Sequence, residues 1–155
     1  MSPARNGGIH ILLVEDNPGD VDLAKDALRQ FTTPHTLHVA SDGAQALQFL
    51  SDAARSVEDL PHLILLDLNL PRTDGREVLA VIKGDERLGH IPVIVLTSSN
   101  AERDLQQAYR LHANCFLTKP SDVEQFFAMF ELIERFWLQL VKLPPHICSH
   151  VTEGP

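Results

Sequence analysis

The fold is decided by residues 63–67, Leu-Ile-Leu-Leu-Asp, four consecutive apolar residues that end on a carboxylate. Two similar runs, at 9–14 and 91–96, are also nearly continuous in hydrophobicity rather than alternating. The strands of a parallel sheet have this pattern when helices cover both faces of the sheet. We therefore expect these three runs to be buried strands, and two weaker runs, at 36–40 and 114–117, to be strands nearer the sheet edges.

Helix-length segments separate the apolar runs, and we place them at about 18–30, 44–53, 75–83, 101–111 and 123–140. Pro18 is acceptable at the start of the first segment. Ser121, followed three residues later by Glu124, predicts a capping box before the last one. Strands that alternate with helices indicate five βα units, and hence an α/β fold with an open, doubly wound parallel sheet.

Length and composition favour one ordinary globular domain of 155 residues, 44% apolar and 22% charged. The 13 Lys and Arg against 21 Asp and Glu give a net charge of −8, which offers no basic footprint for nucleic acid. No apolar stretch approaches the ~20 residues that span a bilayer. The first eight residues lack a signal-peptide core, and two cysteines make no disulfide framework. We expect a cytoplasmic protein with an arm at 1–8, one domain at 9–142 and a tail at 143–155.

Polar side chains stand where the predicted strands end. Glu15 and Asp16 follow the first strand, Asp67 the third, Thr97 closes the fourth, and Lys119 follows the fifth. Each alone has a plainer explanation as a helix cap or a solvated loop residue. Asp67 is the exception, because a carboxylate at the sheet centre is partly desolvated and needs a partner. Since parallel strands end at one edge, where open α/β sheets bind ligands, we expect all five to converge.

This set of groups predicts phosphoryl chemistry with a metal ion. Closely spaced carboxylates repel one another unless a cation keeps them ionised, and a hard cation with oxygen ligands indicates Mg²⁺. An ionised Asp beside Mg²⁺ can act as the nucleophile on a phosphoryl donor. We assign that role to Asp67, the metal to Glu15 and Asp16, and the phosphoryl oxygens to Lys119 and Thr97.

The motifs Glu15-Asp16-Asn17, Asp67 with its following Leu-Asn-Leu-Pro, Asp74-Gly75, Thr97-Ser98 and Lys119-Pro120 resemble the receiver domain of bacterial two-component response regulators. The resemblance runs from about residue 9 to 137. It implies a flavodoxin-like (βα)₅ fold with strand order 2-1-3-4-5. It also implies phosphorylation of Asp67 by the phosphohistidine of a histidine kinase, in the presence of Mg²⁺ or Mn²⁺.

The resemblance assigns further roles. The backbone carbonyl of Asn69 is implied as an additional metal ligand, and Ser98 joins Thr97 and Lys119 around the phosphoryl group. Phe116 takes the place of the family's switch aromatic, where Tyr is common. Because Phe has no hydroxyl, we expect the switch to act by ring packing. The family also implies a cis bond between Lys119 and Pro120.

A narrower resemblance covers 15–20, 72–76 and 136–144, which are similar to the stand-alone response regulators that partner bacterial and cyanobacterial phytochromes. We expect no output domain after the predicted receiver. We therefore expect signalling through protein contacts or through a phosphorelay, with a phytochrome-type histidine kinase as partner and no enzymatic activity beyond phosphotransfer and slow autodephosphorylation.

The last predicted helix carries more apolar residues than one sheet face can cover. A stripe at helical spacing is expected to pack in the core, at Val123, Phe126, Phe127, Phe130, Ile133, Trp137 and Val141. Its flank is expected to form a partner surface for a homodimer, at Met129, Leu132, Phe136 and Leu143.

Other functions fit the residues less well. A haloacid dehalogenase-type phosphatase, which also uses Asp, Thr, Lys and Mg²⁺, carries its nucleophile on the first strand in an Asp-x-Asp pattern that this chain lacks. A flavodoxin binds the phosphate of FMN in the loop after its first strand. In this chain that loop contains acidic residues, which would repel the phosphate. A phosphorylation-independent adaptor is the remaining alternative. The tail motif His146-x-Cys148-x-His150 matches neither common zinc spacing, and we do not predict a metal site there.

Overall fold

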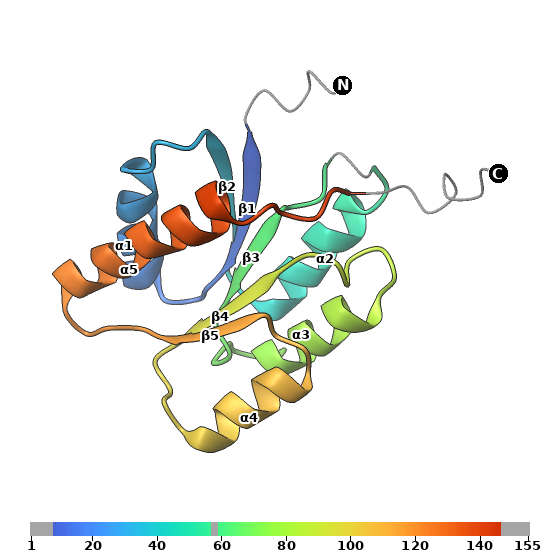
Figure 1. Ribbon diagram of the computed structural model, residues 1–155. Helices are drawn as coiled ribbons and strands as arrows, with labels where there is room; N and C mark the ends of the chain where they lie inside the picture. The colour runs from blue at the N-terminus through green and yellow to red at the C-terminus, as the bar shows by residue number, and fades with distance from the viewer. Residues whose placement is uncertain (1–7, 57–58, 147–155) are drawn as a thin grey trace.

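Five parallel strands form a single sheet in the computed structural model, which describes residues 8–56 and 59–146 (Figure 1). They are β1 (Ile9–Val14), β2 (His35–Ala40), β3 (Leu63–Leu66), β4 (Val93–Thr97) and β5 (Cys115–Thr118). Their order across the sheet is β2-β1-β3-β4-β5. The predicted fold and strand order are confirmed, and the strand that decides the fold is the central one.

Strand register aligns the carboxyl ends at one edge. Val14 of β1 is the partner of Leu66 in β3, and Leu66 is in turn the partner of Val95 in β4. The hydrogen bonds between neighbouring strands continue one residue past the strand ends. The backbone N–H of Asp67 donates to Val14 O at 3.1 Å, and that of Lys119 donates to Thr97 O at 2.8 Å. Sheet hydrogen bonds therefore fix the backbone of the residues that follow the strands.

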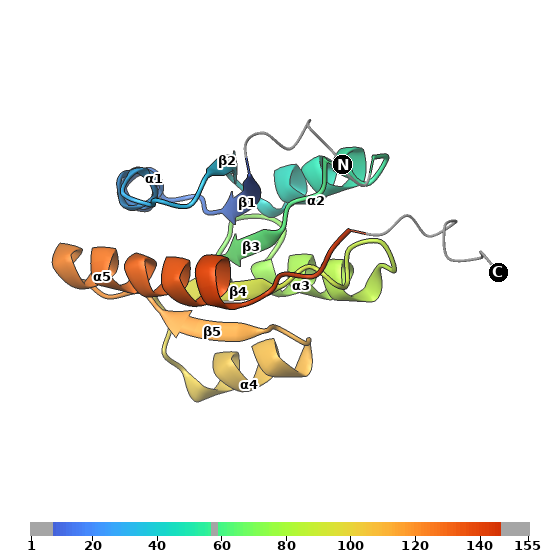
Figure 2. The same ribbon diagram turned by 45° about the horizontal axis from the view of Figure 1, so that its top comes forward.

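Helices cover both faces of the sheet (Figure 2). They are α1 (Pro18–Arg29), α2 (Gly43–Ala53), α3 (Gly75–Gly84), α4 (Glu102–Arg110) and α5 (Val123–Ile133), the last continued by a π-helical segment, η3 (Glu134–Leu140). Helices α2, α3 and α4 pack in one core cluster and α1 with α5 in another. No helix among the described residues has the length and apolar character to cross a bilayer.

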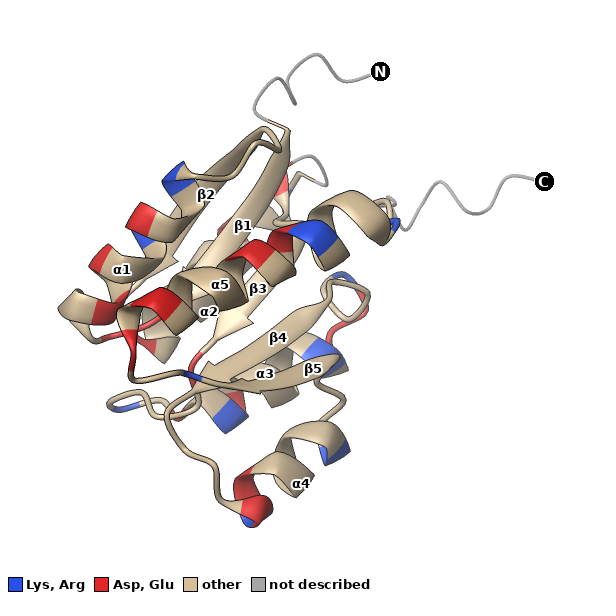
Figure 3. Cartoon of the chain, turned by 60° about the vertical axis from the view of Figure 1, so that its left-hand side comes forward, with Lys and Arg blue, Asp and Glu red and all other residues tan. Residues whose placement is uncertain are grey.

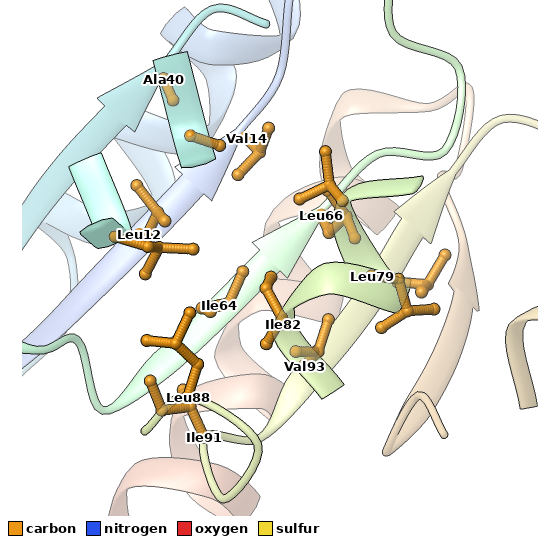
Figure 4. Close-up of a cluster of buried hydrophobic side chains, with 14 of the residues drawn as sticks. Leu12, Val14, Ala40, Ile64, Leu66, Leu79, Ile82, Leu88, Ile91 and Val93 are labelled. Atoms are coloured by element: carbon orange, nitrogen blue, oxygen red, sulfur yellow. The ribbon is translucent and has the colours of Figure 1, made fainter. Parts of the chain in front are cut away.

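The two clusters explain the continuous apolar runs. Leu12, Ile64 and Val93 point to the α2–α3–α4 side (Figure 4), whereas their neighbours Leu63 and Ile94 point to the α1–α5 side. Successive side chains of a strand alternate between faces, so a strand that is covered on both sides is apolar at every position.

Several local predictions are wrong. The N-cap of α5 is Asp122, whose side chain accepts from Glu124 N, so Ser121 forms no capping box there; the capping box lies instead at Asp74 and Glu77 of α3. Val123 is half exposed rather than in the core, because the buried face of α5 begins one turn later. The described residues contain no cis peptide bond, so the Lys119–Pro120 bond is trans, the isomer that X–Pro bonds favour by about 0.5–1 kcal/mol.

The predicted long helix also changes character at Glu134. This residue is buried, and its carboxylate accepts hydrogen bonds from Thr32 N and Thr33 N, both at 2.8 Å. Burial opposes ionisation, but these bonds outweigh it and lower the pKa of Glu134. The change from α-helix to π-helix therefore occurs at the residue whose buried carboxylate is hydrogen-bonded to the loop after α1.

Candidate functional site

Three carboxylates meet at the carboxyl edge of the sheet. Glu15, Asp16 and Asp67 each offer an oxygen that lies within 4.8 Å of the others. Glu15 and Asp67 are buried, and Asp16 is exposed. Figure 3 shows acidic residues in red near the ends of β1 and β3, and a basic residue in blue after β5. A cluster of carboxylate oxygens that is open on one side is the donor set that a hard divalent cation prefers.

Lys119 lies at the centre of the acidic groups. Its Nζ donates to Glu15 Oε1 at 2.5 Å, Asp20 Oδ2 at 2.8 Å and Asp67 Oδ2 at 3.0 Å. The Lys119 side chain is only 7% exposed. An ammonium has three hydrogens, so these three carboxylates use its full donor capacity. The predicted convergence of Lys119 with Glu15 and Asp67 is therefore observed.

Sequence reasoning missed Asp20 as a partner of this lysine. Asn17 is the N-cap of α1 and accepts from Asp20 N, which places Asp20 in the first helical turn. Side chains in that turn point back towards the helix start, and here the helix start lies at the site. The signal was present in the stretch Glu-Asp-Asn-Pro-Gly-Asp, but an acidic residue in a first turn is also explained by the helix dipole alone.

Burial and neighbouring charge shift two ionisations in opposite senses. Burial raises the pKa of Glu15 to about 7, with the Asp67 carboxylate adding to the rise and the hydrogen bond from Lys119 opposing it. Burial lowers the pKa of Lys119, but its bonds to Asp20 and Glu15 outweigh that effect and raise it above the usual range. Lys119 is thus charged at any physiological pH, whereas Glu15 keeps its proton to a higher pH than an exposed carboxyl group does when no metal ion is bound.

Thr97 and Asn69 form the polar side of the site next to Asp67. Thr97 is buried, and its hydroxyl accepts from Asn69 Nδ2 at 3.1 Å and from Ser99 N at 3.4 Å. The backbone N–H of Asn69 donates to Asp67 Oδ1 at 3.0 Å. Asn69 therefore contacts the Asp67 carboxylate through its backbone and the Thr97 hydroxyl through its side chain. Sequence reasoning missed the side-chain contact. Its predicted carbonyl ligand role stays a prediction.

Close backbone packing behind Asp67 explains the glycine of the Asp74-Gly75 motif. The Gly75 N–H donates to Leu68 O at 3.1 Å. A Cβ at position 75 would overlap the carbonyl oxygen of Asp67. Helix α3 can therefore begin directly against the loop that carries the carboxylate only with glycine at this position.

Phe116 shares a sheet face with Thr97. It is half-buried against the α2–α3–α4 cluster and pairs with Val95, which lies two residues before Thr97 on β4. Residues two apart on a strand point to the same face, so Thr97 and Phe116 both face this cluster. Ser98, the other predicted switch residue, is exposed beside the site.

The predicted partner surface is exposed in part. Leu132 is 62% and Phe136 49% exposed, and Leu140, which the prediction omitted, is also exposed. Met129 and Leu143 are half-buried, and Met129 packs against the α1–α5 core cluster. The tail motif is described only at His146; Cys148 and His150 lie outside the described residues.

Comparison with known proteins shows that the sequence matches a known family. Residues 11–131 match the model of the response regulator receiver domain. Response regulator Rcp1 of Synechocystis sp. is 46% identical over 145 residues, covering 93% of this chain and 99% of that protein. The probable methanogenesis regulatory protein FilR2 of Methanothrix harundinacea is 41% identical over 128 residues, covering 83% of each.

Solved structures agree with that match. The Mn²⁺-bound form of Rcp1 is 47% identical, with a TM-score of 0.81 over 88% of this chain and 99% of that one. The phosphorylated cyanobacterial phytochrome response regulator RcpA is 45% identical, with a TM-score of 0.83 over the same shares. The bacteriophytochrome response regulator AtBRR is 41% identical, with a TM-score of 0.66 over 87% of this chain and 99% of that one.

Proposed function

The chain belongs to the response regulator receiver domain family, and from that premise we propose that Asp67 accepts a phosphoryl group from the phosphohistidine of a histidine kinase. One observation carries the proposal: Asp67 is buried after the central strand, within the acidic cluster and 3.0 Å from the Lys119 ammonium. A carboxylate in that position lies beside an ammonium that can neutralise a phosphoryl oxygen.

We propose Mg²⁺ as the resident cation, held by Glu15, Asp16, Asp67 and the backbone carbonyl of Asn69. The acidic cluster fits a divalent ion by its donor chemistry, and the relative Rcp1 has a structure with Mn²⁺ bound. When bound, the ion supplies positive charge to the phosphoryl oxygens and keeps the carboxylates ionised.

The protein's own groups then have defined tasks in phosphotransfer. A carboxylate oxygen of Asp67 attacks the phosphorus; the new P–O bond forms as the P–N bond to the donor imidazole breaks, and that bond's electron pair stays on the imidazole nitrogen. Lys119 exchanges its bond to Asp67 for a phosphoryl oxygen. Glu15 and Asp20 keep the ammonium in place while it does so.

We propose that phosphorylation is signalled through Thr97 and Phe116. The Thr97 hydroxyl exchanges its hydrogen bond with Asn69 for one to the phosphoryl group, and exposed Ser98 joins it there. Because Thr97 and Phe116 share one face, movement of β4 towards the phosphoryl group opens space for the Phe116 ring. Ring packing carries the change, since Phe116 has no hydroxyl.

The alternatives have less support. A phosphatase of the haloacid dehalogenase type places its nucleophile after the first strand, whereas here the buried Asp67 follows β3, third in sequence. The intact set of acidic residues, Thr97 and Lys119 argues against an adaptor that works without phosphorylation. We propose that the chain is not an enzyme beyond phosphotransfer and slow loss of its own phosphoryl group.

We propose a phytochrome-type histidine kinase as the donor, because the similar solved structures include phytochrome and bacteriophytochrome response regulators. Family membership supports a cytoplasmic location. We propose that the receiver domain spans 9–142, which contains the matched residues 11–131, whereas most of the predicted arm (1–8) and tail (143–155) lies outside the described residues. We also propose a homodimer through the exposed flank of α5 and η3 at Leu132 and Phe136, next to half-buried Met129 and Leu143.

Phosphotransfer profiling tests the proposal. Purified histidine kinases, including phytochrome-linked ones, are labelled with radioactive phosphate and mixed briefly with the protein and Mg²⁺. We expect rapid transfer from a phytochrome-type kinase, none to Asp67→Asn and none with EDTA. Transfer that persists in Asp67→Asn would contradict the phosphoacceptor, whereas faster transfer from an unrelated kinase would contradict only the choice of partner.

A further inference from the structure

Five histidines gather at the amino end of the sheet, opposite the acidic site. This histidine cluster comprises His10 on β1, His38 on β2, His62 before β3, His90 before β4 and His146 in the segment after η3. Figures 1 and 2 both show that segment crossing the amino end of the sheet towards the chain before β3 and β4. The fold thus brings together imidazoles from five separate segments.

Imidazole nitrogens face each other at close range in this cluster. His90 Nε2 lies 2.8 Å from His146 Nδ1, across 56 residues of sequence, and His10 Nδ1 lies 3.0 Å from His38 Nε2. The His62 ring packs against His146, with ring centroids 4.7 Å apart. The His90–His146 contact joins the tail to the sheet, so it is made by the fold rather than by local chain geometry.

The His90 imidazole of this pair is available in the neutral form that binds metals. Burial lowers the pKa of His90, and the nearby Lys83 ammonium adds to the effect. Lys83 is itself held by Gly89 O at 3.1 Å and Ile91 O at 2.8 Å, so its charge stays beside the loop that carries His90. Two charged imidazoles at 2.8 Å would repel, whereas two neutral ones can share a proton or a metal ion.

The geometry of the pair suits one metal ion. Two nitrogens bound to the same tetrahedral Zn²⁺ at ~2.0–2.1 Å lie about 3.3 Å apart, so a separation of 2.8 Å needs only a small opening. In the neutral pair, one of the two facing nitrogens carries a hydrogen. When the metal ion binds, that hydrogen moves to the other nitrogen of its own ring, so both facing nitrogens have a lone pair for the ion and no proton is released overall. His62 is not a ligand in this arrangement, because its Nδ1 accepts from His10 N at 3.0 Å and its other nitrogen then carries the hydrogen.

We propose that His90 Nε2 and His146 Nδ1 form a binding site for a divalent transition metal ion, with water in the remaining coordination positions. Imidazole nitrogen selects Zn²⁺, Ni²⁺ or Cu²⁺ over Mg²⁺, so this site and the acidic site take different ions. Packing of His62 against His146 orients the ligand ring, as outer contacts do at known metal sites. The bound ion joins the segment after η3 to the loop that precedes β4.

Calorimetric titration of the full chain with Zn²⁺ tests the proposal, with excess Mg²⁺ present to occupy the acidic site. We expect one Zn²⁺ per chain, at least tenfold weaker binding in His90→Gln and in His146→Gln, and unchanged binding in His112→Asn. His112 is an exposed histidine at positive φ, a conformation that Asn tolerates, so it is the matched control.

A thermal melt of each variant without Zn²⁺ verifies folding, and Zn²⁺ should raise the melting temperature of the parent and of His112→Asn but not of folded His90→Gln. Zn²⁺ binding that is unchanged in His90→Gln would overturn the proposal, because the tail would then bind the ion without the sheet. So would an equal loss in His112→Asn, or no binding to the parent chain.

Discussion

Replacing Glu15 with Gln should change how the stability of the metal-free protein depends on pH. The folded-state pKa of Glu15 is raised from 4.5 to about 7, chiefly by burial. A carboxyl group with a raised pKa holds its proton more tightly in the folded state, so its contribution to stability is complete below pH 4.5 and is lost as the pH rises towards 7. The amide of Gln does not titrate, so the stability of Glu15→Gln does not fall with rising pH at this position.

The size of the effect follows from the same shift. Each unit of pKa is worth about 1.4 kcal/mol, so between pH 5.5 and 8 the Glu15 carboxyl should lower the free energy of unfolding by about 2 kcal/mol. His38 and His90, whose pKa values are lowered by burial, have the opposite effect in this range. The quantity to compare is therefore the difference between Glu15→Gln and the parent protein, not either curve alone.

Urea unfolding in EDTA at pH 5.5, 6.5, 7.5 and 8.0 measures this difference. Relative to the parent, Glu15→Gln should gain about 2 kcal/mol across the series. Mg²⁺ titrations add a second readout, since the ion displaces the Glu15 proton and should bind the parent about tenfold more weakly at pH 6 than at pH 8. Parallel stability curves for parent and variant would refute the raised pKa of Glu15.

Four further outcomes follow from the structure. Lys119→Met leaves the acidic cluster without its cation, so urea unfolding should show a loss of stability that is greater at pH 8 than at pH 5.5 and is largely restored by Mg²⁺. Asn69→Ala removes the amide that donates to the Thr97 hydroxyl and so competes with the phosphoryl group for it. The phosphorylated variant should therefore lose its phosphoryl group more slowly than the parent, as followed on a phosphate-affinity gel. An unchanged half-life would count against this competition. Phe130→Ala empties a fully buried site and should cost about 3–5 kcal/mol in urea unfolding, whereas a cost under about 1 kcal/mol would place that ring outside the core. Leu132→Asp should give a monomer in sedimentation at concentrations where the parent is a dimer, and a parent that is monomeric with and without a phosphoryl mimic would remove the proposed interface.

The central acidic site could be predicted from the sequence because strand period and sheet topology determine it. Once the run at 63–66 is assigned to a buried parallel strand, Asp67 must lie at the ligand-binding edge, and Glu15, Asp16, Thr97 and Lys119 follow by the same rule. No side-chain detail was needed for that conclusion. The trans Lys119–Pro120 bond shows that a feature carried over from the family is less secure.

Contacts that depend on side-chain direction or on the path of a loop could not be predicted in this way. Asp20 reaches Lys119 because α1 starts against the site, and Asn69 meets Thr97 through its side chain rather than its backbone. The contact between His146 and His90 depends on the route of a tail that has no periodic pattern. In each case the residue had an adequate local explanation, and only the folded chain supplies the partner.

Incubation with acetyl phosphate and Mg²⁺, followed by intact-mass measurement and borohydride trapping, determines whether Asp67 accepts a phosphoryl group. We expect the mass of one added phosphoryl group, trapped at Asp67 as homoserine, and no addition to Asp67→Asn or in EDTA. An unchanged mass, or a phosphoryl group trapped at another residue, would contradict it.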